Sequence, residues 1–531
     1  MVKIVTQNYN PNEVISIYGS HDASITFIDK NNDVRVYEYE RFVKKRYAMF
    51  SSRFDGWDLM GSNQNERIEF LTHTKNNLNN ADIKLVLYLE LNDNDKNLIK
   101  SFFPNAEVML MKHHFSHAAS GFYASKFKKS LIFSVDGGGH DYSQVYTTRA
   151  YLGEDEKINE LNCQNYDFGN PYSAIGWLIS EISSEHKTKH SLTNAGKVMG
   201  LCAYGKVRNE WIGHFEKFYD NKSLEFLCSS LGVQCEKDVL SGQDSFDAAT
   251  TSQYVFERKM NELIIPFVDE YKTNVVLVGG CALNVLYNQK LHEYLKDLDV
   301  ELHVPSNPND CGESYGMFLT MFPNLGTQEI CYNGIEILDE ELYDKFLSDF
   351  PNEDLTIDKI VKYLKQGKIL GLVNGYSEVG PRALGNRSII CDPSFPNMKD
   401  ILNAKVKFRE WFRPFAPVCR IQDMKTYFEN PKESNYMSYA PMIKTEYTDK
   451  VRSIVHEDKT TRLQTTTSET HKLFNDILDK LAELNHIPII LNTSFNIKGL
   501  PILTRYEDAF YVLENTELDF LVIKNKIFKK K

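Results

Sequence analysis

Short apolar runs rich in β-branched residues recur along this chain, and stretches with helical spacing separate them. Such runs occupy residues 14–18, 131–135 and 275–278, and glycine follows each of them at once or after a single residue. A short apolar run that ends at glycine is typical of a buried strand, and strands that alternate with helices are typical of an α/β sheet. The pattern therefore predicts an α/β fold for this part of the chain.

A second α/β unit is predicted towards the C-terminus. Residues 360–366 have helical spacing, and the apolar run at residues 369–373 follows them closely. Between residues 322 and 354 the chain is acidic and contains Pro, Gly and Asn, which is typical of a surface connection. We therefore predict two domains, residues 1–345 and residues 346–531, and a chain of 531 residues is long enough for both.

Composition narrows the class of protein. The chain is 42% hydrophobic and 25% charged, and it shows neither an apolar stretch of membrane-spanning length nor an apolar signal core. These features predict a cytoplasmic protein without a membrane partner. The nine cysteines include no CxxC pair, so we expect reduced thiols instead of a disulfide framework or a cysteine zinc module.

The charge distribution bears on nucleic-acid binding. A net charge of -11 disfavours indiscriminate binding, although basic clusters lie at residues 41–46 and 524–531. We interpret residues 524–531 as a frayed, solvated end. Residues 41–57 interleave basic and aromatic side chains, which can follow a nucleic-acid strand and stack its bases, or can form a helix edge and a core contact.

Two histidines at helical spacing indicate a metal site. His113 and His117 are four residues apart, so on a helix both imidazoles lie on one face and can reach one cation. His114 lies on another face, where we expect it to pack or form hydrogen bonds. The alternative is that the pair are ordinary polar residues of an amphipathic helix.

Three turns that follow apolar runs carry further candidate ligands. Asp136 precedes three glycines and could hold a cation, while Gly279 and Gly280 could admit a nucleotide before the amide of Asn284. Asp310 lies at a turn ahead of an apolar helix. Each has a structural alternative, which is a hairpin turn for Asp136 and a helix-capping region for Asp310.

The C-terminal unit concentrates cations among aromatic residues and prolines. A loop with Pro and Gly punctuation carries Arg382 and Arg387, and Lys407 and Arg413 bracket Glu410-Trp411-Phe412. Guanidinium groups and backbone N–H donors in fixed geometry bind multiply anionic substrates, so the loop around Arg382 predicts an oxyanion cradle. An exposed basic surface is the alternative.

These motifs resemble those of the nodulation-type and tobramycin-type O-carbamoyltransferases. The similarity spans residues 14 to 504 and includes the segments around His113, Arg382, Lys407 and Asn492. It implies an N-terminal domain with a duplicated, actin-like and sugar-kinase-like α/β fold. It also implies a C-terminal α/β domain similar to threonylcarbamoyl-adenylate synthases.

The resemblance also implies roles for individual residues. It implies that iron, as Fe(II) or another divalent metal, is held by His113, His117, Asp136 and Asp310, and that His21 is a general base. It assigns carbamoyl phosphate and ATP, with Mg2+, to Arg382, Lys407, Arg413, Arg462, Asn492 and Ser494. Further contacts to nucleotide or phosphate are expected from Lys197, Gly279, Gly280 and Asn284. The chain departs from the family pattern at Tyr376, where arginine is usual, and at Leu500, where glutamate is usual.

The function predicted on this basis is ATP-dependent O-carbamoyl transfer through a carbamoyl adenylate. The acceptor hydroxyl belongs either to a sugar or other natural product, or to the 5-hydroxymethyl group of a modified cytosine in DNA, which would have to be flipped out of a duplex. A carbamoyltransferase that acts on a protein cysteine would carry cysteine-rich zinc modules, and the sequence has none. The remaining alternative is an ATP-binding regulatory protein on the actin-like fold without transfer activity. A homodimer is compatible with the sequence.

Overall fold

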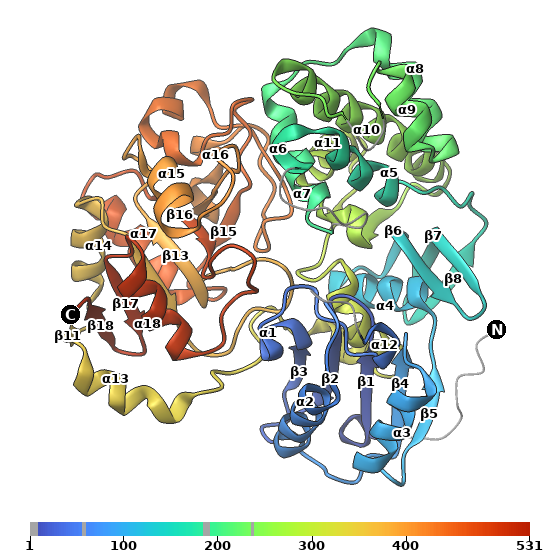
Figure 1. The fold of residues 1–531 in the computed structure, drawn as a ribbon, viewed down its shortest axis with the longest axis horizontal. Coiled ribbons are helices and arrows are strands. Elements are labelled where there is room, and N and C mark those ends of the chain that lie inside the picture. The colour runs from blue at the N-terminus through green and yellow to red at the C-terminus, as the bar shows by residue number, and fades with distance from the viewer. Residues whose placement is uncertain (1–8, 56–59, 184–191, 235–237) are drawn as a thin grey trace.

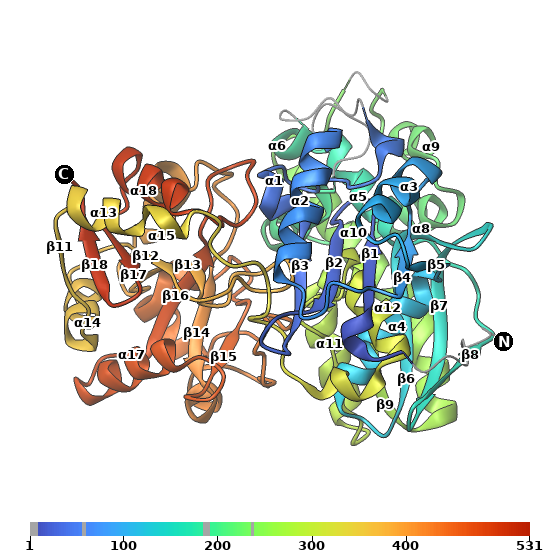
Figure 2. The ribbon, with the colours of Figure 1, turned by 90° about the horizontal axis from the view of Figure 1, so that it is seen from below.

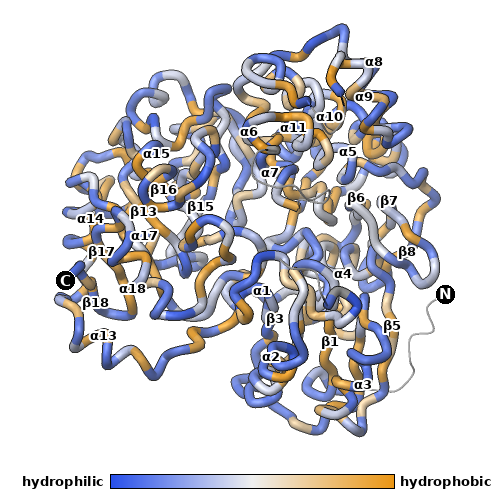
Figure 3. The backbone as a smooth tube through the Cα atoms, viewed as in Figure 1, coloured by the Kyte–Doolittle hydropathy of each residue, from blue (hydrophilic) through white to orange (hydrophobic). Residues whose placement is uncertain are grey.

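The computed structural model describes residues 9–55, 60–183, 192–234 and 238–531. Its strands form three sheets, two with five strands and one with eight (Figure 1). Hydrophobic residues recur along many of the strands and helices (Figure 3). This mixture of helices and sheets confirms the predicted α/β class.

The first sheet has the strand order β3-β2-β1-β4-β5. Its central strand, β1, pairs antiparallel with β2 and parallel with β4. All five residues of β1 are buried, because helices cover both faces of the sheet. The bounds are β1 (Val14–Tyr18), β2 (Ser24–Ile28), β3 (Val34–Glu38), β4 (Leu85–Leu89) and β5 (Glu107–Leu110).

The second sheet repeats this topology. Its order is β10-β9-β6-β7-β8, and its central strand β6 pairs antiparallel with β7 and parallel with β9. The strands are β6 (Lys129–Asp141), β7 (Gln144–Glu154), β8 (Lys157–Leu161), β9 (Asn274–Val278) and β10 (Leu302–His303). Two sheets with the same order and sense confirm the predicted duplication, which no repeat in the sequence displays.

Two helices join the five-stranded sheets. Helix α4 (His113–Ser125) packs on β6 and β9, helix α12 (Glu313–Met321) packs on β1 and β2, and the two helices pack on each other. Glycine makes this approach possible, because a Cβ on Gly316 would lie 1.9 Å from the carbonyl oxygen of Ser116. A Cβ on Gly121 would similarly lie 2.5 Å from a methyl group of Val278. The helix pair therefore fixes how the two sheets face each other.

The remaining helices lie outside this pair. In the N-terminal half these are α1 (Tyr39–Val43), α2 (Gln64–Asn77), α3 (Asp93–Phe102), α5 (Gly169–Ala174), α6 (Ser180–Ser183), α7 (Asn194–Leu201), α8 (Asn209–Asn221), α9 (Leu224–Ser230), α10 (Gln243–Tyr271) and α11 (Val285–Lys296). In the C-terminal half they are α13 (Tyr343–Asp349), α14 (Ile357–Lys365), α15 (Met398–Ile401), α16 (Met424–Tyr427), α17 (Lys472–Glu483) and α18 (Tyr506–Asn515). Within the described ranges, no helix combines the length and apolar character needed to cross a membrane.

The third sheet has eight strands in the order β11-β18-β17-β12-β13-β16-β14-β15 (Figure 2 shows this body beside the first two sheets). Parallel and antiparallel pairs occur together in it. Its strands are β11 (Asn352–Asp354), β12 (Leu370–Val373), β13 (Arg387–Cys391), β14 (Ala416–Arg420), β15 (Gln464–Thr466), β16 (Ile489–Ser494), β17 (Phe520–Ile523) and β18 (Lys526–Lys529).

The interpretation of the C-terminus as a frayed end is wrong. Strand β18 lies between β11 and β17, and Phe528 is fully buried against α13 and α18 through Tyr343 and Phe510. The lysines around it pair with acids, for example Lys526 with Asp354. The lysine-rich composition hides this strand, because two adjacent buried residues, Ile527 and Phe528, lie between the half-buried Lys526 and Lys529.

The segment between residues 322 and 354 is also more deeply packed than predicted. Cys331 and Ile335 are buried, and backbone hydrogen bonds tie both to the loop at residues 377–379. Within the same segment Asn333 bonds to the backbone of β3. The connection thus holds the two halves together instead of lying free on the surface. The division of the chain at residue 345 stays a prediction.

Strand β18 gives a test of the C-terminal packing. Phe528→Ala removes a fully buried ring and should lower the free energy of unfolding by about 3–5 kcal/mol. Tyr511→Ala, which removes a ring that is 58% exposed, should cost about 1 kcal/mol or less. Denaturant unfolding of both variants checks this, and equal losses would contradict the assignment of β18 to the core.

Candidate functional site

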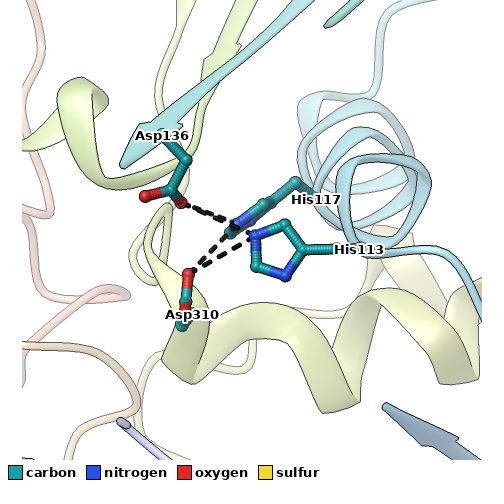
Figure 4. Close-up of side chains that lie close together, drawn as sticks. All are labelled: His113, His117, Asp136 and Asp310. Carbon is teal, nitrogen blue, oxygen red and sulfur yellow. Dashed lines mark hydrogen bonds and ion pairs between the residues drawn. The ribbon is translucent and has the colours of Figure 1, made fainter. Parts of the chain in front are cut away.

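The histidine pair opens helix α4. His113 is the first residue of the helix and His117 lies one turn later, so both imidazoles point to one side (Figure 4). Both are buried, with 1% and 0% exposure. His114 lies apart from them, as predicted, and its ring bonds to Ser134 and to the carbonyl of Tyr146.

Two aspartates from distant segments complete the group. His117 Nε2 lies 3.1 Å from Asp136 Oδ2 and 3.3 Å from Asp310 Oδ1. His113 Nε2 lies 3.8 Å from each of the same two oxygens. One donor atom from each residue lies within 4.8 Å of the others, so the structure brings the four predicted ligands together (Figure 4). Their role as metal ligands stays a prediction.

Glycines make room for this group. A Cβ on Gly139 would lie 1.9 Å from the His113 ring, and one on Gly279, whose φ is +89°, would lie 2.2 Å from the carbonyl oxygen of Val135. The N–H of Gly280 donates to Asp136 Oδ2 at 3.1 Å. In this structure Gly279 and Gly280 therefore orient a carboxylate, and their predicted contact with a nucleotide is untested.

The electrostatics of the cluster favour positive charge. Burial alone lowers the pKa of each imidazole, but the neighbouring carboxylates outweigh it, chiefly Glu313 followed by the aspartates. The pKa of His113 is raised to about 9, and that of His117 is raised well above its ordinary value. Protonated imidazoles would balance the charge of the buried carboxylates, and a bound cation could balance it in their place.

Glu313 is the member of the group that the sequence interpretation missed. It begins α12, is fully buried, and places Oε1 3.0 Å from His117 Nε2. The signal was present in the sequence, because Glu313 follows Asp310 by three residues and the start of a helix puts both on one side.

His21 lies at the edge of the cluster. Its Nε2 is 3.5 Å from Asp310 Oδ2 and its Nδ1 is 3.2 Å from Asp22 Oδ2. Burial lowers the pKa of His21, but Asp310 and then Asp22 raise it, to about 10 in total. His21 can therefore accept a proton at neutral pH only when another cation neutralises Asp310. The predicted role of His21 as a base is untested.

The predicted cations of the C-terminal half form a second group. Arg382, Arg413 and Arg462 are half-buried, and their mutual repulsion adds to burial in lowering the pKa of Arg382 and Arg462. Arg409, which the prediction did not include, belongs to the same group. Arg382 and Arg462 show no ion pair with any carboxylate in the described part of the chain. Such unbalanced positive charge is typical of an anion site.

Lys407 is held by neutral oxygens next to these arginines. Its ammonium donates to Ser494 Oγ at 3.2 Å and to the carbonyl of Asn496 at 2.7 Å. Burial and then Arg409 and Arg413 hold its pKa well below the ordinary value. Asn492 bonds to the carbonyl of Ala383, so the amide is fixed on the arginine loop. The structure thus places Lys407, Ser494 and Asn492 at one end of β16.

The oxyanion cradle predicted around Arg382 is wrong in its backbone part. Four consecutive N–H groups, from Leu384 to Arg387, donate to Glu378 Oε1 at 2.7–3.2 Å. A side chain of the same loop therefore fills the place intended for a substrate anion. The guanidinium of Arg387 is also structural, since it donates to the carbonyls of Asn374 and Gly375.

Two predicted nucleotide contacts have structural partners. Lys197 Nζ lies 2.7 Å from Glu410 Oε1, so it joins α7 to the C-terminal half. Asn284 caps α11 by accepting from the N–H of Tyr287, and its amide exchanges hydrogen bonds with Gln253. Neither arrangement tests ligand binding, and both predictions stay open.

Three consecutive residues dock the C-terminal half on α7 and its neighbours. Besides the Glu410 pair, Trp411 packs against Tyr204, and Phe412 lies in contact range of Gly200. These residues lie between the predicted ligands Lys407 and Arg413. Two predicted anion ligands and the contact between the two halves of the chain therefore lie on one segment.

The two departures from the family pattern lie at different places. Tyr376 stacks under the guanidinium of Arg35 at 3.6 Å, so its ring packs on the N-terminal half. Leu500 is 39% exposed and lines a cleft that also contains Asn496 and Lys44.

The basic and aromatic segment at residues 41–57 is largely engaged within the protein. Lys44 pairs with Asp508, Lys45 pairs with Glu66, and Phe50 is buried in the core. Trp57 lies outside the described residues. These contacts favour the interpretation as a helix edge and a core contact.

Comparisons with known proteins agree with this geometry. Family models described as Carbamoyltransferase N-terminus and Carbamoyltransferase C-terminus match residues 62–318 and 361–530. Nodulation protein NolO of Bradyrhizobium diazoefficiens is 29% identical over 79% of this chain and 79% of its own length. Nodulation protein U of Sinorhizobium fredii is 27% identical over 73% of this chain and 72% of its own. The solved structure of full-length HypF in the phosphate- and nucleotide-bound form is 12% identical over 59% of this chain and 56% of that chain, with a TM-score of 0.37, too low to support an argument.

The carboxylate of Glu378 gives a direct test of the arginine loop. Glu378→Ala leaves four N–H donors without their acceptor and should lower the free energy of unfolding by at least about 3 kcal/mol. Glu378→Gln keeps an acceptor oxygen and should lose less. Urea unfolding checks the order, with the exposed Glu446→Ala as control. Glu378→Ala with wild-type stability would contradict the structural role.

Proposed function

Because the chain belongs to the carbamoyltransferase family, we propose that it activates carbamoyl phosphate with ATP and transfers the carbamoyl group to a hydroxyl. The observation that carries the proposal is the pairing of two opposite sites. A buried acidic cluster with two histidines lies in one half, and a group with more arginines than carboxylates lies in the other. The family makes the protein a transferase, and the two sites support a division into two steps.

The arginine group suits the first step. Making a carbamoyl adenylate from carbamoyl phosphate and ATP consumes water and releases phosphate and diphosphate, so every reactant and product apart from water is anionic. Arg382, Arg413 and Arg462 offer guanidinium forks to these groups, and Lys407 offers a point charge beside them. Glu410 lies 3.5 Å from Arg413, which orients that guanidinium while leaving the group positive overall.

The histidine and aspartate cluster suits a divalent cation. His113 Nε2, which faces both aspartates, is buried without a hydrogen bond to any described residue, as expected for a nitrogen that binds a metal ion. His113, His117, Asp136 and Asp310 would hold the ion, and imidazole with carboxylate fits iron, manganese or zinc. When bound, the ion would supply positive charge to a phosphoryl or carbamoyl oxygen.

The two sites come from distant parts of the chain, but segments that carry them touch. The segment that carries Asp310 lies directly against the loop that carries Arg382, because a Cβ on Gly380 would lie 2.2 Å from the carbonyl oxygen of Ser306. A mixed anhydride hydrolyses in water, so transfer between neighbouring sites limits its loss. His21 would then accept the proton of the acceptor hydroxyl once the charge of Asp310 is neutralised.

We take a hydroxyl-bearing small molecule as the acceptor class. The relatives named as nodulation proteins favour it, and the contacts of Lys44 and Lys45 leave the candidate DNA segment few free cations. A hydroxymethylated DNA base is the alternative that an experiment must distinguish.

The division into two steps predicts that variants of the two sites lose different steps of the reaction. Arg462→Ala and Arg413→Ala should lower carbamoyl-phosphate-dependent exchange of diphosphate into ATP by roughly 100-fold or more, because charge stabilisation is lost. His117→Ala should retain exchange and lose carbamoyl transfer. Arg452→Ala, at an exposed arginine, is the matched control. Loss of exchange in His117→Ala to the same extent would contradict the division, and ATP binding without turnover in the wild type would favour the regulatory alternative.

The acceptor class is tested by mass spectrometry. The enzyme, ATP, carbamoyl phosphate and ferrous iron would be incubated with sugars and aminoglycosides, and in parallel with DNA that contains hydroxymethylcytosine. We expect one carbamoyl group on a small molecule and none on the DNA. Carbamoylated DNA would overturn the choice of acceptor and leave the transfer reaction intact.

A further inference from the structure

Glu313 is a buried acid that the proposed reaction does not use. Its side chain is 0% exposed, and neither carboxylate oxygen accepts a hydrogen bond from any residue that the structure describes. A buried ionised carboxylate needs a positive charge close to it. The imidazole of His117, at 3.0 Å, can supply that charge when it is protonated, and a metal ion shared by both side chains can supply it instead.

A simpler explanation for the buried carboxylate of Glu313 is that it stabilises the N-terminus of α12. The geometry does not support this explanation. Glu313 is the first residue of α12, where a negative charge is favourable beside the free N–H groups. However, its oxygens accept from none of these N–H groups. The side chain points towards the imidazoles instead, with Oε1 3.0 Å from His117 Nε2 and 3.9 Å from His113 Nδ1.

The distances from His117 Nε2 match those between atoms that share one ion. Three carboxylate oxygens surround His117 Nε2, from Glu313 at 3.0 Å, Asp136 at 3.1 Å and Asp310 at 3.3 Å. Bonds of about 2.0–2.2 Å to one metal place neighbouring donor atoms roughly 3.0–3.5 Å apart. Glu313 is thus as close to His117 Nε2 as the two aspartates are.

We propose that Glu313 is a fifth protein donor of the metal site, beside the two histidines and two aspartates. The inference rests on the proposed metal site and adds to it a preference among ions. A donor set of two imidazoles and three carboxylates carries three negative charges and exceeds the four ligands that structural zinc accepts. It favours a divalent ion with five or six ligands and an affinity for oxygen, such as iron or manganese.

Cobalt(II) is the probe that tests the donor set, because its visible absorption is weak with six ligands, stronger with five and strongest with four. Glu313→Gln keeps the shape and removes the charge. We expect it to weaken Co(II) binding about 10-fold to 100-fold in calorimetry and to strengthen the visible bands, as the number of donors falls. Glu313→Asp should restore part of the affinity.

The control is Glu90→Gln. Glu90 is also a mostly buried carboxylate, but it pairs with His140 and Arg53 instead of the histidine cluster. The Glu90→Gln variant should bind Co(II) as the wild type does. Unchanged spectrum and affinity in Glu313→Gln would overturn the inference, and so would weaker binding with an unchanged spectrum, which would place Glu313 outside the donor set. A wild type that binds no divalent ion would instead overturn the proposed metal site itself.

Discussion

The close approach of α4 and α12 is the contact on which both five-stranded sheets depend. Gly316 lets the α12 backbone lie against Ser116 of α4, and any larger residue would push the helices apart. Helix α4 carries His113 and His117, while α12 begins just after Asp310 and carries Glu313. The same contact that holds two sheets together therefore brings the ligands from separate segments to one point. Packing and the candidate metal site are a single constraint in this molecule.

Charge is the second principle of the architecture. Acids gather where the two five-stranded sheets meet, and arginines gather in the C-terminal half, so each site attracts ions of the opposite sign. Ion pairs across the interface keep these two groups in register, above all that of Lys197 with Glu410. Arg41 adds a second link by donating to the carbonyl of Gly380 at 2.6 Å. Because the acids and the arginines are separate, the acidic cluster can hold a cation while the arginine group holds anionic reactants.

The sequence interpretation was wrong where the same residues can either face solvent or a ligand, or pack within the protein. A loop rich in Gly and Arg predicts an anion cradle, yet Glu378 from the same loop occupies its N–H groups, because an internal carboxylate competes with any ligand for those donors. A lysine-rich terminus predicts solvation, yet β18 buries Ile527 and Phe528 between two lysines. In both cases the composition of the segment suggested that it contacts solvent or substrate. In the structure the segment contacts other residues of the chain instead.

The sequence by itself determined the α/β class, the helix that carries the histidines and the identity of four of the candidate ligands, because apolar runs, helical spacing and family motifs are local properties. It also pointed to Arg382, Lys407, Arg413 and Arg462, which the structure gathers into one group. Only the tertiary structure decided that Glu313 faces the histidines and that Glu410 bridges the halves. These depend on contacts between residues far apart in the chain, or on the direction in which a side chain points, and no local pattern records either.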